Sequence, residues 1–152
     1  MTDNMEKRVL PNELLLGEVA RLVSEGEKVT LMTKGVSMLP FIVGGKDSVI
    51  LEKPSELEVG MIVLAEIHKG VYVLHRIISI EGEKVTLMGD GNIRGCEFCR
   101  VDNIAAVATF ILKKNGKSID CSSRRHQRQA RIWKRLLPVR RWILAVYRRV
   151  FI

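Results

Sequence analysis

Hydrophobic and polar residues alternate along much of this chain, the pattern that places successive side chains on opposite faces of a β-strand. In residues 28 to 34, Val29, Leu31 and Thr33 alternate with Thr30 and Met32. Further strand-like segments follow at short intervals, separated by turn-forming residues; they are 47–52, 61–67, 71–80, 84–89 and 103–113. We therefore predict a mainly β (α+β) fold built on a coiled antiparallel β-sheet.

A helical period replaces this alternation at both ends of the strand-rich region. Residues 12–25 carry apolar side chains at helical spacing, with Asn12 as a candidate N-cap and Gly26 just past the end. Residues 121–152 show a second helical pattern that Pro138 divides in two. Its apolar positions are Ile132, Trp133, Leu136 and Leu137, then Val139, Trp142, Ile143, Val146, Tyr147 and Val150.

Charge changes sharply at residue 121. Residues 1–120 carry 15 Lys and Arg against 17 Asp and Glu, whereas residues 121–152 carry 10 Lys and Arg and no acid. We interpret this boundary as a β-rich domain over 1–120, with a helix at 12–25 and a β-core at 28–113, followed by a basic helical appendage over 121–152.

A basic amphipathic helix with tryptophan is typical of a segment that lies on an anionic membrane surface. Trp133, Arg140, Arg141 and Trp142 are the residues that we expect at such a surface. Two alternatives stay open: the apolar stripe could pack on the domain, or the arginines could contact nucleic acid, which we favour least.

Ser37 and His75 are the candidate chemistry. Ser37 lies in Gly35-Val36-Ser37-Met38-Leu39-Pro40, and His75 in Tyr72-Val73-Leu74-His75-Arg76-Ile77. Glycine and proline on the two sides of the serine predict a tight turn that displays its hydroxyl. A serine hydroxyl is a weak nucleophile until a base takes its proton, and imidazole suits that task near neutral pH. Each motif alone is more often an ordinary turn or a core histidine.

Considered together and in order, these segments resemble the peptidase fold shared by signal peptidase I and the self-cleaving LexA-type repressors. The resemblance covers residues 28–112 and includes the Gly-x-Ser-Met-x-Pro box, a base box that ends in arginine, and a Gly-Asp-Asn box at Gly89-Asp90-Gly91-Asn92. It implies a serine endopeptidase, without metal or cofactor, that holds an extended peptide substrate beside strand 28–34. Gly35 and the amide of Ser37 would then face the oxyanion.

The base distinguishes branches of this superfamily. Ordinary bacterial signal peptidases and LexA-type repressors place a lysine before that arginine, whereas the histidine-type signal peptidases of archaea and the endoplasmic reticulum place a histidine, as His75 does here. Lys34 is the rival base in this chain, but it precedes Ser37 by only three residues, so we expect the two side chains not to converge. We therefore assign Ser37 as nucleophile and His75 as base.

A carboxylate would orient His75 and stabilise its charged form. Asp90 matches the acidic residue of the Gly-Asp-Asn box and is our catalytic candidate. Glu97 or Asp102 could take that role instead, because Asp90 could simply cap a turn. We expect Arg76 to brace the loops.

Two other functions stay open at this stage. The chain could be an inactive peptide-binding module, or a LexA-like self-cleaving regulator. The second is disfavoured because the sequence contains no Ala-Gly pair and no DNA-binding domain.

The remaining sequence features concern location and cysteine chemistry. The first residues show no secretory signal, and no run of 18 apolar residues occurs, so we expect neither leader nor transmembrane helix. An odd count of three cysteines fits a reducing compartment. We therefore expect a cytoplasmic protein, or one peripheral on the cytoplasmic membrane. Cys96, Cys99, Cys121 and His126 could begin a zinc site, but their spacing is loose and we favour idle thiols.

Overall fold

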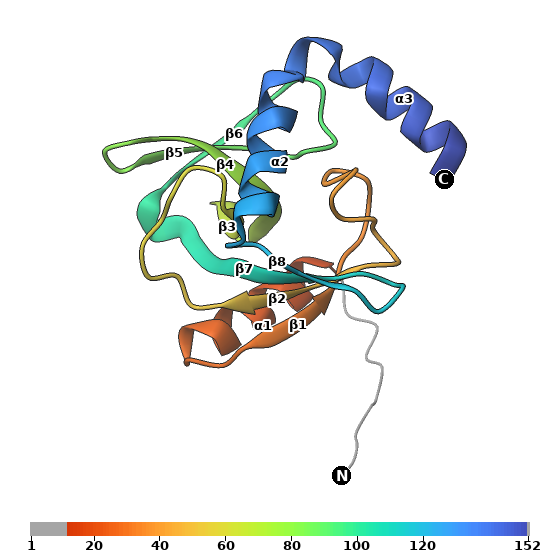
Figure 1. Cartoon of the computed structure of the whole chain (residues 1–152). Helices are drawn as coiled ribbons and strands as arrows, with labels where there is room; N and C mark the ends of the chain where they lie inside the picture. Colours follow the sequence, from red (N-terminus) through yellow and green to blue (C-terminus); the bar gives the residue numbers. More distant parts are fainter. Residues whose placement is uncertain (1–11, 152) are drawn as a thin grey trace.

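Residues 12–151 are described by the computed structural model, and they form an eight-stranded antiparallel sheet with helices at both ends (Figure 1). The strand order is β1-β2-β7-β3-β4-β5-β6, and β8 pairs with β7. The strands are β1 (Val29–Met32), β2 (Ser48–Glu52), β3 (Ile62–His68), β4 (Val71–Glu81), β5 (Lys84–Met88), β6 (Glu97–Arg100), β7 (Ile104–Leu112) and β8 (Ser118–Asp120). The helices are α1 (Asn12–Ser24), α2 (Arg124–Arg135) and α3 (Arg140–Phe151), with short 3-10 helices η1 (Val101–Asn103) and η2 (Leu137–Val139).

The prediction of a mainly antiparallel β fold with helices at the two ends is confirmed. Register shifts interrupt four of the strand pairings, for example between Ile50 and Leu51 of β2. Such bulges increase the local twist and bend a sheet. Strands β6 and β8 were not predicted, because Glu97–Arg100 and Ser118–Asp120 are short and polar and each pairs with only one neighbour.

Strand β3 is buried on both faces and separates two hydrophobic clusters. Ile62 and Leu64 pack in the first cluster, with α1, β1, β2 and β7. Val63 and Ala65 pack in the second, with β4, β5 and β7. This explains why the first four residues of β3, Ile62–Ala65, are all apolar, as in strands that are covered on both faces.

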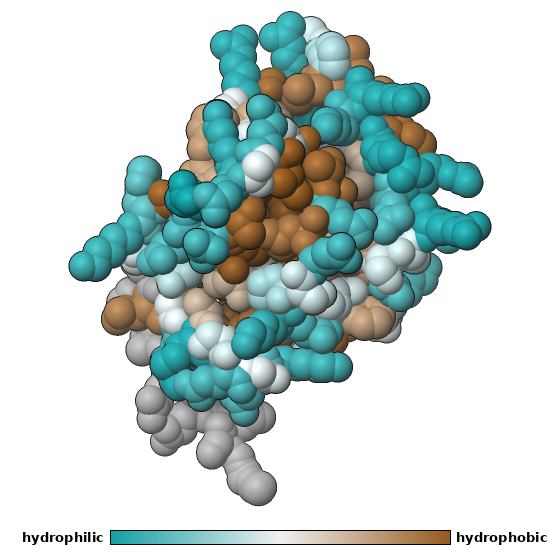
Figure 2. Space-filling model, turned by 90° about the vertical axis from the view of Figure 1, so that its left-hand side faces the viewer, coloured by the Kyte–Doolittle hydropathy of each residue, from teal (hydrophilic) through white to brown (hydrophobic). Residues whose placement is uncertain are grey.

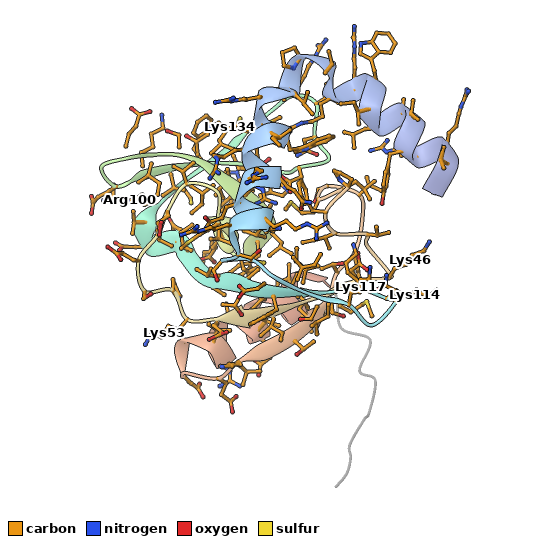
Figure 3. All side chains as sticks on the ribbon, in the orientation of Figure 1. Lys46, Lys53, Arg100, Lys114, Lys117 and Lys134 are labelled. Atoms are coloured by element: carbon orange, nitrogen blue, oxygen red, sulfur yellow. The ribbon has the colours of Figure 1, made fainter. Side chains whose placement is uncertain are left out.

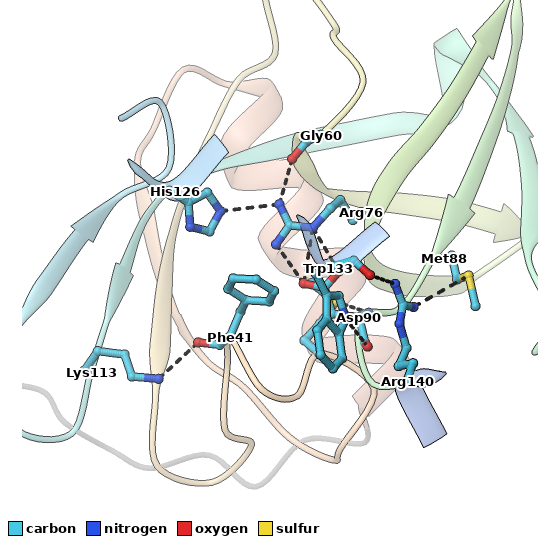
Figure 4. Close-up of polar contacts among 10 residues, drawn as sticks. Phe41, Gly60, Arg76, Met88, Asp90, Lys113, His126, Trp133 and Arg140 are labelled. Carbon is cyan, nitrogen blue, oxygen red and sulfur yellow. Dashed lines mark hydrogen bonds and ion pairs between the residues drawn. The ribbon is translucent and has the colours of Figure 1, made fainter. Parts of the chain in front are cut away.

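Helix α2 packs against the sheet, so residues 121–151 are not a detached appendage. Trp133 is 6% exposed, and its Nε1 donates a hydrogen bond to the Asp90 carbonyl oxygen at 2.7 Å. Arg140 is 4% exposed and donates to the carbonyl oxygen of Asn92. It also donates to the carbonyl oxygen of Trp133 (Figure 4). The expectation that Trp133 and Arg140 face a membrane is therefore wrong: spacing identified an amphipathic stripe, but not which of its members would find partners in the domain.

The break between the last two helices lies where Pro138 predicts it. Helix α2 ends at Arg135, and Pro138 lies in η2, two residues before α3 begins.

The other two residues that we expected at a surface, Arg141 and Trp142, are exposed.

Hydrophobic side chains also gather at the surface. Figure 2 shows one face of the molecule, where a central hydrophobic area is surrounded by hydrophilic side chains. Many of the exposed large hydrophobic residues belong to the last part of the chain, and these are Ile132, Leu137, Val139, Trp142, Ile143, Val146 and Val150.

His126, on the first turn of α2, is a buried histidine in contact with Arg76. Its side chain is buried against the edge of Phe41, and its Nε2 lies 3.3 Å from Arg76 Nη1. Arg76 can only donate, so Nε2 accepts and the ring is neutral. Burial, and then the nearby Arg76 charge, lower the pKa of His126 to about 4.

We predict that His126 makes the fold sensitive to mild acid. The unfolded chain binds a proton on this ring near pH 6.5 and the folded chain only near pH 4, so acidification between these values favours the unfolded chain. The loss is on the order of 3 kcal/mol at most. Urea unfolding of wild type and His126→Gln at pH 7 and pH 4.5 should show a smaller acid loss in the variant, because glutamine accepts from Arg76 without titrating. Equal acid losses in the two proteins would contradict this, and His68→Gln at an exposed position is the control.

Candidate functional site

The loop between β1 and β2 presents Ser37, and glycine contacts set its shape. Gly35 has a φ of 78°, in the left-handed region that suits glycine. A Cβ on Gly44 would lie 2.1 Å from the Gly35 carbonyl oxygen, so only glycine allows the two segments to touch. Downstream, the amide of Gly45 donates to the Thr33 carbonyl oxygen at 2.8 Å and closes the loop. Ser37 is half-buried at its turn.

The turn after β5 lies against the backbone of Ser37. The amide of Gly91 donates to the Ser37 carbonyl oxygen at 2.7 Å. A Cβ on Gly91 would lie 2.1 Å from the Val36 oxygen, and one on Gly89 would lie 2.4 Å from the Ser37 oxygen and 3.1 Å from His75 Cδ2. Gly89 therefore lies close to both Ser37 and His75. A side chain at either glycine of the Gly-Asp-Gly-Asn segment would clash with these neighbours, which is why both positions are glycine.

The imidazole of His75 is held by Glu97. His75 projects from β4 and is buried, and its Nδ1 lies 2.5 Å from Glu97 Oε1. Glu97 reaches this position because β6 pairs with β5, with Glu97 opposite Leu87. We assign the proton to Nδ1 from this contact, which leaves Nε2 as the ring nitrogen able to accept one.

Asp90 is engaged elsewhere, in a buried ion pair with Arg76. Arg76 Nη2 donates to Asp90 Oδ2 at 2.7 Å and Nε donates to Oδ1 at 2.9 Å, and both side chains are almost fully buried. Arg76 Nη1 also donates to the Gly60 carbonyl oxygen at 2.8 Å (Figure 4). The contacts of His75 thus favour Glu97 over Asp90 as its partner, and Asp102, on η1, is not among them.

Ser37 and His75 line one pocket, of about 190 Å³, between the Ser37 loop and β4. Lys34, the rival base, lines this pocket too. Its side chain is exposed, however, and a lysine acts as a base where it is shielded from water. Within residues 12–151 the Ser37 hydroxyl makes no hydrogen bond with the His75 ring.

Two unpaired strand edges border this pocket. In the described sheet β1 pairs with β2 alone, so its other edge is free. Residues 71–75 of β4 pair with β3, whereas pairing of β4 with β5 begins only at Arg76. The amides of residues 35–38 also donate no hydrogen bond within the described chain. Backbone donors and acceptors therefore surround the pocket and are available to an extended peptide.

Comparison of the chain with protein-family models finds no match, and comparison with curated protein sequences finds none either.

Among the described helices, none is both long and apolar enough to cross a bilayer. No three His, Cys, Asp or Glu side chains of residues 12–151 come together as metal ligands. The cysteines are free, with Cys96 exposed and Cys99 and Cys121 partly buried.

Reasoning from sequence placed Asp90 first for the partner of His75, with Glu97 or Asp102 as the alternatives. The missing signal was the strand β6: the alternation of Glu97–Arg100 is too short to predict, and only its pairing with β5 brings Glu97 to the imidazole. The sequence also did not predict which side chains pack behind the Ser37 loop. Trp133 and Arg140 do so, although their spacing had assigned them to an outer surface.

We predict that the two carboxylates differ in their effect on stability. Asp90→Asn should lower the free energy of unfolding by roughly 3–5 kcal/mol, because it leaves the Arg76 charge buried without a counter-charge. Glu97→Gln makes the matched chemical change at a partly exposed site and keeps an oxygen for Nδ1, so it should cost less than about 1 kcal/mol. Urea unfolding at pH 7 measures both. Equal losses would mean that the Arg76–Asp90 pair is not the stronger structural contact.

Proposed function

We propose that this chain is a serine endopeptidase, similar to the histidine-type signal peptidases, with Ser37 as nucleophile, His75 as general base and Glu97 as the orienting carboxylate. The observation that carries the proposal is that Ser37 and His75 both line one pocket, which two unpaired strand edges border, while Glu97 contacts Nδ1 of the imidazole. A nucleophilic hydroxyl, a base that takes its proton and a carboxylate that orients the base are the three groups of an activated serine.

The reaction would proceed through an acyl-enzyme. Ser37 Oγ attacks the carbonyl carbon of the scissile peptide bond while His75 Nε2 takes the hydroxyl proton. Glu97 stabilises the resulting imidazolium through Nδ1–H. The tetrahedral intermediate breaks its C–N bond, and His75 returns the proton to the leaving amine. Water then attacks the acyl-enzyme with His75 again as base, which releases the acid and restores Ser37.

The oxyanion would be stabilised by backbone amides of the Ser37 loop. The amides of residues 35–38 have no acceptor within the described chain, so the Ser37 amide is available where negative charge develops. The contacts of Gly44 with Gly35, and of Gly91 with Val36, support the loop in this shape. Preorganised donors of this kind contribute more to rate than donors that must reorient during the reaction.

Substrate would bind as an added strand. An extended peptide can pair with the free edge of β1, with that of β4 at residues 71–75, or with both. The pocket between these edges has apolar walls that include Leu31, Leu74 and Tyr72. Backbone pairing therefore supplies affinity that depends little on sequence, and an apolar side chain of the substrate enters the pocket.

A second candidate function is a peptide-binding module without catalysis. The observation in its favour is the absence of a hydrogen bond between the Ser37 hydroxyl and the His75 ring within residues 12–151. Catalytic hydrogen bonds commonly tighten only when substrate is bound, so we rank peptide cleavage first. The binding module shares the strand edges and pocket, and it differs only in the reactivity of Ser37.

We predict that a serine-directed acylating probe modifies Ser37 and that the modification depends on His75 and Glu97. Intact-mass spectrometry should show one adduct on wild type and none on Ser37→Ala. We expect the rate of labelling to fall by about 10²–10⁴-fold in His75→Ala, because the general base is lost. Glu97→Gln should label at least about tenfold more slowly, since the imidazolium loses its counter-charge.

Matched variants separate this chemistry from folding. Lys34→Ala removes the rival base, and His68→Ala removes an exposed histidine; both should label as wild type does. Circular dichroism verifies that each variant is folded. Labelling lost in Lys34→Ala but retained in His75→Ala would overturn the assignment of the base. A folded wild type that binds an extended peptide but takes no label would support the binding module instead.

A further inference from the structure

We propose that α3 docks the protein onto an anionic lipid bilayer through its exposed apolar face. This proposal concerns a surface outside the Ser37 pocket, and it stands whether or not Ser37 is catalytic. Two features carry it: a ridge of exposed hydrophobic side chains, and the basic side chains that border this ridge.

The ridge follows one side of the last helix and the residue before it. Trp142, Val146 and Val150 are 62%, 63% and 67% exposed, and Val139 and Ile143 are exposed as well. Their spacing of three or four residues places them on one face of a helix. We call these five residues, Val139, Trp142, Ile143, Val146 and Val150, the apolar ridge.

The other side of α3 is already occupied, which determines where the ridge points. Leu144 is 2% exposed and packs with Leu39 and Trp133, and Tyr147 packs against the same cluster. Arg140 ties the start of the helix to the Asn92 carbonyl oxygen. The helix cannot turn the ridge inward without exposing Leu144 and breaking the contacts of Arg140, so the ridge faces outward in the folded protein.

Positive charge surrounds the ridge. Of the ten Lys and Arg residues in 121–152, Arg140 alone is buried, and the segment contains no acid. Arg141 lies with its guanidinium 4.7 Å from the centre of the Trp142 ring, and Arg148 and Arg149 are exposed on the last turn. An anionic surface attracts each such residue by roughly 1 kcal/mol.

Three more exposed lysines lie on the domain itself, outside α3. Figure 3 shows Lys46, Lys114 and Lys117 near one another, around the turn between β7 and β8. The amide of Lys114 donates to Asp47 Oδ1 at 3.1 Å, which joins this turn to the loop that carries Lys46.

An anionic bilayer fits both features, and two other partners fit only one. Nucleic acid phosphates would use the arginines but leave the ridge in water. A second copy of this chain could cover the ridge, but a two-fold contact would bring two strongly positive segments together without counter-charge. A bilayer surface accepts apolar side chains at the boundary between headgroups and acyl chains, and it supplies the negative charge.

The test measures binding of the full chain to vesicles of phosphatidylglycerol and phosphatidylcholine in equal parts, by sedimentation. Val146→Glu places a charge on the ridge, and we expect at least a tenfold loss of affinity. Val59→Glu makes the same change at an exposed position outside residues 121–152, and its affinity should stay within twofold of wild type. Vesicles of phosphatidylcholine alone should bind at least tenfold more weakly than the mixed vesicles.

Tryptophan fluorescence identifies the contact, because Trp142 is exposed and Trp133 is buried. Wild-type emission should shift to shorter wavelength on anionic vesicles, and Trp142→Phe should bind without that shift. Failure to sediment with anionic vesicles, or equal losses in Val146→Glu and Val59→Glu, would overturn the proposal. So would a dimer in solution that Val146→Glu dissociates, or tight binding to duplex DNA that Val146→Glu leaves unchanged.

Discussion

The buried ion pair between Arg76 and Asp90 is the contact on which the site depends. Arg76 belongs to β4, and Asp90 to the turn after β5, so the pair joins the strand of the candidate base to the turn that supports the candidate nucleophile. A charged pair taken out of water is stable only when further hydrogen bonds satisfy it. Here Arg76 also donates to the Gly60 oxygen and contacts His126, and the backbone oxygen of Asp90 accepts from Trp133.

The position of Asp90 determines where its two neighbouring glycines lie. A Cβ on Gly89 would clash with the Ser37 carbonyl oxygen, and one on Gly91 would clash with the Val36 carbonyl oxygen. The Ser37 turn is therefore supported from behind by a turn that is itself tied to β4. Two carboxylates consequently have different parts in the structure: the buried Asp90 neutralises an arginine, whereas the partly exposed Glu97 holds an imidazole at the edge of a pocket.

The last two helices serve two purposes through opposite faces. Trp133, Arg140 and Leu144 complete the packing behind the Ser37 loop, with Leu39 fully buried beneath them. The apolar ridge faces solvent beside a basic surface. One amphipathic stripe in the sequence is thus divided between the protein interior and the outside, and Tyr147 lies on the inner side of that division.

The sequence by itself determined which segments are strands and which are helices. Apolar residues two positions apart favour a strand, and apolar residues three or four positions apart favour a helix. The sequence indicated α1, six strands, the break at Pro138 and the two segments that carry Ser37 and His75, since these depend on local pattern and on glycine and proline. Tertiary structure alone decided the partners of the charged groups. Glu97 reaches His75 because β6 pairs with β5, and Asp90 goes to Arg76 because both are buried, where a charge requires a counter-charge. Spacing cannot report such pairings, because they join residues that are distant along the chain.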